Sequence, residues 1–247
     1  MLLEGKTAIV YGGGGAMGGA VARAFARAGA TVHVTGRTQS KLDRVAEDIQ
    51  AAGGQATTAA VDAYDVDQVE GHLAGVDHVD ISFNAVGLTV VQNKPLAELT
   101  VEEFVTPVEQ AARTQFVTAT AVAKRMIAQG HGVIIMLSSS ASRESGYEMG
   151  GFSLACAAVE CFNRALAGEV GPHGVRVVTI RPNFTPETSP EPVDLTSPEM
   201  APMILSTALR RLPRLTEVAE TAAFVASDHA GAMTGAIVNL SCGAIVD

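Results

Sequence analysis

Residues 7–20 of this 247-residue chain read TAIVYGGGGAMGGA. An apolar run at residues 8–11 meets four consecutive glycines, residues 12–15, and an alanine-rich amphipathic segment follows from Met17. This order predicts a buried strand, a tight turn and the N-terminus of a helix. Glycine lets a ligand approach the backbone, and the free N–H groups of a helix N-terminus favour a pyrophosphate. The stretch therefore indicates a dinucleotide site, if a βαβ unit surrounds it.

The rest of the chain alternates strand-like and helix-like segments, as in a parallel sheet covered by helices. We expect further strands at residues 31–35, 55–61, 79–83, 133–137, 175–180 and 236–240. We expect helices at residues 17–28, 40–52 and 152–170, and two more between residues 100 and 127. Ser40 is the expected cap of the helix that follows it, and Thr100 begins a capping-box pattern. The prediction is an α/β fold, a Rossmann-type doubly wound parallel sheet of about seven strands, as one domain over residues 1–247.

A proline-rich segment interrupts this alternation, because six of the ten prolines lie between residues 182 and 202. Such a segment cannot form one regular helix. It follows the carboxyl end of a predicted strand, where open α/β sheets bind their ligands. Residues 183–207 therefore form either a lid on the substrate side or a plain connector.

Composition excludes several classes of function. The formal net charge is −9 and no basic cluster occurs, so we expect no nucleic-acid partner. No apolar run approaches the ~20 residues that span a bilayer, and no signal-peptide pattern is apparent. The three cysteines, Cys156, Cys161 and Cys242, lack metal-ligand spacing. We expect a reduced cytoplasmic protein that binds no metal and acts on a small molecule.

These features together resemble the short-chain dehydrogenase/reductase family over essentially the whole chain. The family motif T-G-x-x-x-G-x-G aligns with YGGGGAMG at residues 11–18, where Gly12 and Gly18 match and Ala16 replaces the middle glycine. The resemblance implies cofactor contacts from this loop, namely Gly12, Gly14, Gly15, Met17 and Gly18. Ala16 places a methyl group where the backbone would approach the pyrophosphate.

The end of the second predicted strand, TGRT at residues 35–38, bears on the choice of cofactor. An acidic side chain here would accept hydrogen bonds from both ribose hydroxyls and favour NAD, but Gly36 has none. Arg37, followed by Thr38, can pair with a 2′-phosphate, or it can be an ordinary surface arginine. We expect NADP(H).

Further matches to the family are partial. Asp62 and Ala63 stand at the segment that contacts adenine in the family, and the sequence DISFNAVG stands at its N-N-A-G loop. In that loop Asn84 and Gly87 match, whereas Ala85 and Val86 do not. The sequence Arg181-Pro182-Asn183 replaces the usual P-G. The resemblance implies additional cofactor contacts from Asp62, Ala63, Asn84, Ala85, Val86 and Pro182.

The catalytic residues of the family are mostly replaced. Family members use a tyrosine as general acid, a lysine four residues later, a serine about thirteen residues before the tyrosine, and an asparagine in the preceding helix. Counted without gaps, these positions are occupied by Phe152, Cys156, Ser139 and Ala111. Phenylalanine has no proton to give, and a thiol carries no positive charge. Acid–base assistance contributes ~10²–10⁴ in rate, so we expect ordinary ketone reduction to be very slow.

Other residues near this position leave alternatives open. Tyr147, five residues before Phe152, is an alternative acid. Cys156 is either a nucleophile or a small buried hydrophobic residue. Ser139 either binds the substrate oxygen or only caps the end of a strand.

Three functions are compatible with this sequence. The first is an atypical oxidoreductase whose substrate, an iminium ion or an activated C=C bond, accepts hydride without a tyrosine. The second is a non-redox enzyme, such as a cyclase or isomerase, on the same scaffold. The third is a non-catalytic subunit. The resemblance also implies a homodimer or homotetramer formed through the two long helices and the last strand.

Overall fold

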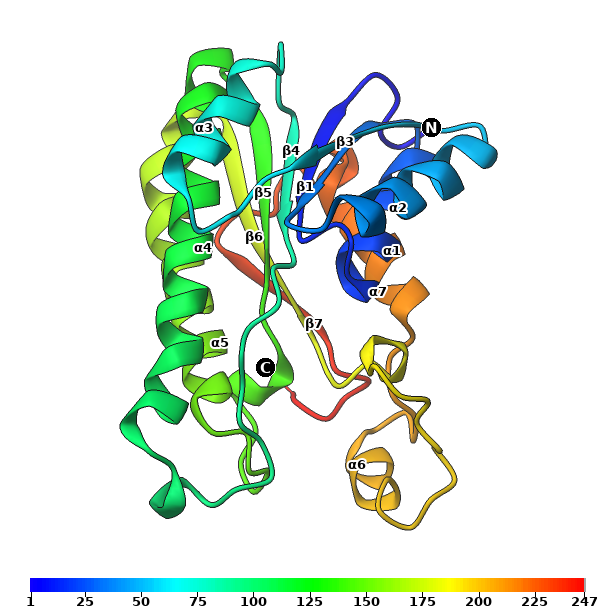
Figure 1. Cartoon of the computed structure of the whole chain (residues 1–247), viewed down its shortest axis with the longest axis vertical. Helices are drawn as coiled ribbons and strands as arrows, with labels where there is room; N and C mark the ends of the chain where they lie inside the picture. Colours follow the sequence, from blue (N-terminus) through cyan, green and yellow to red (C-terminus); the bar gives the residue numbers. More distant parts are fainter. Residues whose placement is uncertain (247) are drawn as a thin grey trace.

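The centre of the molecule is one parallel sheet, seen in the computed structural model, which describes residues 1–246 (Figure 1). Its seven strands lie in the order β3-β2-β1-β4-β5-β6-β7. The strands are β1 (Thr7–Tyr11), β2 (Thr31–Gly36), β3 (Gln55–Ala60), β4 (Ile81–Asn84), β5 (Gly132–Leu137), β6 (Val175–Pro182) and β7 (Ala236–Leu240). The order reverses between β1 and β4, and a ligand crevice is expected at the carboxyl ends of these strands. The predicted doubly wound fold is confirmed.

Helices cover both faces of the sheet. The α-helices of the described residues are α1 (Ala16–Arg27), α2 (Gln39–Ala51), α3 (Val66–Ala74), α4 (Val101–Gln129), α5 (Gly151–Val170), α6 (Ala201–Ser206) and α7 (Leu215–Ala226). Figure 1 shows α1, α2 and α7 on one side of the sheet, and α3, α4 and α5 on the other. Each side buries its own hydrophobic core, and α1 with α7 and α4 with α5 are closely packed pairs.

Two expectations for the helices were wrong. The region after Thr100 forms one helix, α4, and not two. Pro107 lies inside α4 without ending it; as the seventh residue of the helix it removes one backbone N–H, and the helix continues to Gln129. The N-cap of α2 is Thr38 and not Ser40, so the cap lies two residues before the one that we expected.

The proline-rich segment contains a short 3₁₀ turn, Pro186–Thr188, and the six-residue helix α6. It therefore forms no single regular helix, as its prolines predict. Figure 1 shows α6 set apart from the sheet and from the helices on its two faces. Among residues 1–246, no helix combines the length and the hydropathy that crossing a bilayer requires.

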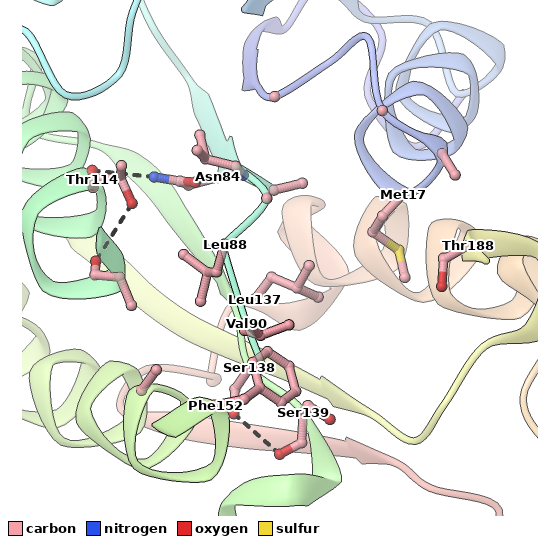
Figure 2. A pocket seen from close by; sticks show the side chains of 18 of the residues that line it. Met17, Asn84, Leu88, Val90, Thr114, Leu137, Ser138, Ser139, Phe152 and Thr188 are labelled. Carbon is pink, nitrogen blue, oxygen red and sulfur yellow. Dashed lines mark hydrogen bonds between the residues drawn. The ribbon is translucent and has the colours of Figure 1, made fainter. Parts of the chain in front are cut away.

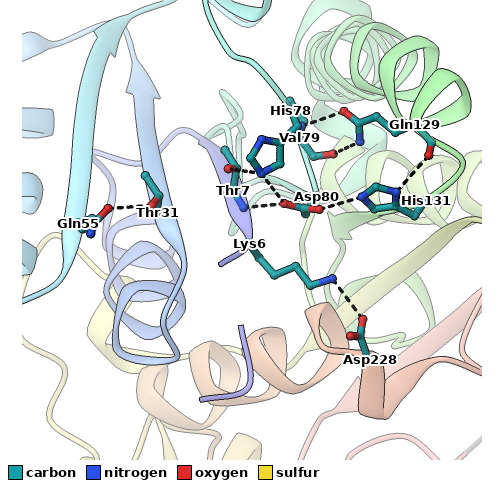
Figure 3. A network of polar contacts seen from close by, with 10 residues as sticks. All are labelled: Lys6, Thr7, Thr31, Gln55, His78, Val79, Asp80, Gln129, His131 and Asp228. Carbon is teal, nitrogen blue, oxygen red and sulfur yellow. Dashed lines mark hydrogen bonds and ion pairs between the residues drawn. The ribbon is translucent and has the colours of Figure 1, made fainter. Parts of the chain in front are cut away.

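A buried carboxylate joins three segments at the end of the sheet opposite the crevice (Figure 3). Asp80 accepts a hydrogen bond from the backbone N–H of Thr7 at 2.7 Å. Its two oxygens lie 3.0 Å from His131 Nε2 and 3.4 Å from His78 Nε2. The Gln129 side chain hydrogen-bonds both backbone groups of Val79. These contacts fasten the start of β1 to the start of β4 and to the segment between α4 and β5.

Candidate cofactor and active site

A cavity of about 860 Å³ opens at the carboxyl ends of the central strands. It brings together nearly all of the site residues that the sequence predicts, although they come from eight separate segments. Those that line it are Gly12, Gly14, Gly15, Met17, Arg37, Thr38, Asp62, Ala63, Asn84, Ala85, Val86, Ala111, Ser139, Phe152, Cys156 and Pro182. Two predicted residues, Gly18 and Tyr147, are not among the residues that line the cavity.

The glycine-rich loop holds β1 close to α1. Gly12 has φ +73°, and a Cβ atom there would lie 2.5 Å from the carbonyl oxygen of Ala85. A Cβ atom on Gly18 would lie 2.3 Å from the carbonyl oxygen of Gly12, so Gly18 permits close packing of the helix behind the loop. Neither position therefore accepts a larger residue without a backbone shift.

The N-terminus of α1 is free to bind an anion. No side chain caps this helix, and its first turn contains no acidic residue. The first N–H groups of a helix have no partner within the helix, and its dipole favours negative charge. Because Gly14, Gly15 and Met17 line the cavity at this end, a pyrophosphate would meet backbone donors there.

The adenosine side of the cavity, as the family resemblance orients it, carries two cations. Arg37 and Lys41 line it together with Gly36 and Thr38. Thr38 is the N-cap of α2, yet its side chain makes no capping hydrogen bond. This corner thus combines positive charge with a second uncapped helix N-terminus, an arrangement that suits a phosphate.

Asn84 anchors the loop that follows β4 (Figure 2). Its Nδ2 donates to Thr118 Oγ1 at 2.9 Å and to the Thr114 carbonyl at 3.2 Å. Its Oδ1 accepts from the Val86 N–H at 3.0 Å. The side chain is buried and fixes the positions of residues 85 and 86 against α4.

The three serines after β5 have different hydrogen-bond partners. Ser138 donates to Glu160 Oε1 at 2.7 Å, and Ser140 donates to Asn183 Oδ1 at 3.1 Å. Ser139 Oγ accepts from the Ala141 N–H at 3.3 Å. A hydroxyl can donate as well as accept, so Ser139 keeps its proton for a further acceptor. Figure 2 shows Ser138, Ser139 and Phe152 grouped in one part of the cavity, away from Met17.

Cys156 lies one helical turn after Phe152 and is buried. Burial, together with the charge of Glu160, raises the pKa of the Cys156 thiol to about 12. The thiol is therefore protonated at neutral pH, which favours the small hydrophobic residue over the nucleophile. Tyr147 is 36% exposed and does not line the cavity, so the structure does not support it as the acid.

A buried ion pair lies behind this wall, and the sequence did not reveal it. Glu160 Oε2 lies 3.4 Å from Arg181 Nη1, and Glu160 Oε1 accepts from Ser142 Oγ at 2.7 Å. Arg181 is only 1% exposed, which is unusual for arginine. The one sequence signal is a charged residue at the end of the apolar strand VRVVTIRP.

Two amide side chains of the cavity wall were also not predicted from the sequence. Gln115 and Asn183 are 6% and 5% exposed, and both line the cavity. Within the part of the chain that the structure describes, Gln115 Oε1 and Asn183 Nδ2 have no hydrogen-bond partner. The available signal was Asn183 itself, which replaces the glycine of the family's P-G pair.

Titratable side chains are almost confined to the adenosine side. Among the described residues that line the cavity, Arg37, Lys41, Asp62 and Cys156 are the titratable ones. Of these, only Cys156 belongs to the wall around Phe152 and Ser139. Across residues 1–246, no group of three or more histidine, cysteine or acidic side chains is arranged to hold a metal ion.

The chain is similar to a known family and to known oxidoreductases over nearly its whole length. A family model described as enoyl-(acyl carrier protein) reductase matches residues 14–244. The chain is 33% identical over 245 residues to an uncharacterised oxidoreductase of Mycobacterium tuberculosis, covering 98% of this chain and 92% of that one. It is 29% identical over 243 residues to the L-xylulose reductase of Bos taurus, covering 98% and 97%.

Solved structures of similar proteins have the same fold as this chain. A short-chain type dehydrogenase/reductase from Mycobacterium marinum superposes with a TM-score of 0.87 at 28% identity, covering 99% of this chain and 97% of that one. A protein from Beutenbergia cavernae, described as a putative NAD(P)-dependent gluconate 5-dehydrogenase with NADP bound at low occupancy, gives a TM-score of 0.87 at 27% identity, covering 98% of this chain and 97% of that one.

Proposed function

Because this chain belongs to the short-chain dehydrogenase/reductase family, we propose that it is an NADP(H)-dependent oxidoreductase whose substrate accepts hydride without a protein general acid. The family binds a nicotinamide cofactor, and the relatives described above are oxidoreductases. Three parts of the proposal are specific to this chain: that it binds a dinucleotide, that this dinucleotide is NADP(H), and that the substrate needs no proton donor.

The residues present fit a dinucleotide. Gly14, Gly15 and Met17 line the cavity, α1 presents uncapped N–H groups beside them, and one continuous cavity runs from Arg37 to Phe152. When bound, the cofactor would supply a hydride from its nicotinamide ring. Gly14, Gly15 and Met17 would hold the pyrophosphate, and Asp62 and Ala63 would contact the adenine.

The preference for NADP(H) rests on charge. A 2′-phosphate carries negative charge that Arg37 and Lys41 would offset, and Gly36 offers no carboxylate to the ribose hydroxyls of NAD. The structure from Beutenbergia cavernae holds NADP at low occupancy, which agrees with this preference.

One observation carries the proposal about the substrate. Around Phe152, no residue that lines the described cavity can give a proton at neutral pH except through a hydroxyl, because the pKa of Cys156 is about 12. An iminium ion accepts hydride with no proton at all. An activated C=C bond accepts hydride to give an enolate, whose oxygen the Ser139 hydroxyl would stabilise and whose carbon water would protonate later.

Two measurements test the proposal. Titration of the protein into NADPH, followed by nicotinamide fluorescence, should show saturable binding. Oxidation of NADPH should then proceed with cyclic iminium ions or enones and be at least ~10²-fold slower with saturated ketones of the same size. Equal rates with ketones would contradict the proposed substrate class. Binding without turnover of any substrate would favour a non-catalytic subunit, and turnover independent of NADPH a non-redox enzyme.

A further inference from the structure

Two buried amides, Gln115 of α4 and Asn183 after β6, face the same cavity with unused hydrogen-bonding capacity. We propose that these two side chains hold the nicotinamide-riboside half of the cofactor. This inference rests on the proposed function, because it needs a dinucleotide in the cavity. It gives a role to Gln115, which lies outside the family motifs, and to Asn183, which replaces the glycine of the P-G pair.

Asn183 has a fixed orientation. Its Oδ1 accepts from the Phe184 N–H at 2.6 Å and from the Ser140 hydroxyl at 3.1 Å. A backbone N–H can only donate, so the atom that faces it must be the amide oxygen and the remaining atom must be the NH₂ group. That NH₂ group is enclosed and has no partner within residues 1–246. A buried donor without an acceptor is costly, and a ligand oxygen would remove this cost.

Gln115 supplies the complementary group from another wall. It lies one turn after Ala111 on α4, and Cys156 lines the same cavity. Its Oε1 has no donor within the described chain. The methyl group of Ala111 can offer no hydrogen bond, and the Cys156 thiol offers only a weak one. A ligand hydroxyl would give Gln115 the donor that this wall lacks.

The nicotinamide-riboside half carries the matching groups. Its ribose has two hydroxyl donors, and its carboxamide has an oxygen that accepts. Gln115 would accept from a ribose hydroxyl and Asn183 would donate to the carboxamide oxygen. Both amides are neutral, whereas the cations Arg37 and Lys41 lie at the adenosine side. The cavity would therefore hold its anionic half by charge and its nicotinamide half by neutral hydrogen bonds.

The test compares two ligands by calorimetric titration. NADPH has both halves, and adenosine 2′,5′-bisphosphate keeps the adenosine and 2′-phosphate but lacks the nicotinamide riboside. Gln115→Met removes the acceptor at similar length, and Asn183→Asp keeps the oxygen that Phe184 and Ser140 use. Each variant should raise the Kd for NADPH roughly 5- to 20-fold, the effect of one hydrogen bond to a buried group, and change the Kd for the bisphosphate less than about 2-fold.

Gln55→Met, on the edge strand β3, is the matched control and should leave both Kd values unchanged. Thermal unfolding without ligand checks that each variant is folded. An unchanged Kd for NADPH in both variants would overturn the inference. An equal loss for both ligands would also overturn it, because the residues would then act only on the fold. If the wild type bound neither ligand, the proposed cofactor site itself would fail.

Discussion

Phe152 and Cys156 occupy one face of the first turns of α5, beside a serine that can still donate a hydrogen bond. The phenyl ring keeps the volume of a tyrosine but loses its hydroxyl. The neutral thiol cannot supply the positive charge of a lysine. These two residues preserve the shape of a reductase site while removing its proton donor.

Restoring both groups should therefore restore ketone reduction. Phe152→Tyr combined with Cys156→Lys should raise kcat/KM for a simple ketone with NADPH by ~10²-fold or more, the usual contribution of general acid–base catalysis. NADPH oxidation measured at 340 nm checks this. Phe152→Tyr alone serves as the control, because without the cation its phenol titrates near ~10. No gain in the double variant would mean that the site lacks more than these two groups.

Arg37 should determine the choice between the two dinucleotides. Arg37→Ala should raise the Kd for NADPH about 10- to 100-fold, the range for a hydrogen bond between charged groups, and change the Kd for NADH little. Arg44→Ala is the matched control, because Arg44 lies on α2, the helix that follows Arg37, and does not line the cavity. Equal losses for NADPH and NADH would refute a 2′-phosphate contact.

At the scale of elements, most of the fold could be predicted from the sequence. Apolar runs such as VIIML, ended by polar or glycine-rich segments, identified all seven strands, and glycines marked most helix ends. Three helices, α3, α6 and α7, were not predicted. α3 has only nine residues and buries only Val69 and Leu73, and α6 has six residues within the proline-rich segment. α7 buries Val218, Ala222 and Ala226 at helical spacing, so its period was present in the sequence and was missed.

The candidate site could be predicted only in part, for a different reason. Motif positions follow from spacing along the chain, which is how Ser139, Phe152 and Arg37 were found. The amides of Gln115 and Asn183 and the Glu160–Arg181 pair depend on contacts between segments. Ser140 and Asn183, for example, are separated by 43 positions, and no local sequence pattern predicts the hydrogen bond between them. Hydrogen-bond capacity left unused on folding is visible only in three dimensions.

The stability of the whole molecule depends on Asp80, at the end of the sheet away from the cofactor. Asp80→Ala leaves the buried Thr7 N–H without an acceptor and should lower the free energy of unfolding by about 2–3 kcal/mol in urea titrations. Asp228→Ala is the control, because its carboxylate is 87% exposed and its ion pair with Lys6 spans 3.5 Å. That change should cost less than about 0.5 kcal/mol. Similar costs for both would refute the structural role of Asp80.

Acid should weaken the fold through a histidine pair. His72 packs edge-on against His33 with ring centroids 5.5 Å apart, and burial, together with the His33 charge, lowers the pKa of His72 to about 4. Between about pH 6.5 and 4 the unfolded chain binds a proton that the folded protein excludes, so stability falls as pH falls. At neutral pH both states are uncharged at this residue, and the effect disappears.

His72→Gln should therefore reduce the drop in Tm between about pH 7 and pH 5. Exposed His173→Gln is the control and should leave the drop as in the wild type. A drop in His72→Gln as large as that of the wild type would contradict the account.

Assembly is the remaining property of the whole molecule, and we propose a homodimer or homotetramer formed through α4 and α5. Phe116 and Leu154, on these helices, are 59% and 47% exposed, which is high for large apolar side chains. Phe116→Asp should therefore lower the molar mass measured by light scattering. A wild type that is monomeric at micromolar concentration would refute the assembly.

The central claim is that no side chain at the nicotinamide end of the cavity hands a proton to the substrate. A crystal structure of the NADPH complex tests this most directly, through the residues that surround the C4 edge of the nicotinamide. The account predicts Ser139 and Phe152 there, with no tyrosine, lysine, histidine or carboxyl group within hydrogen-bond reach of a substrate atom. A structure in which Tyr147 or a lysine has moved into that position would contradict it.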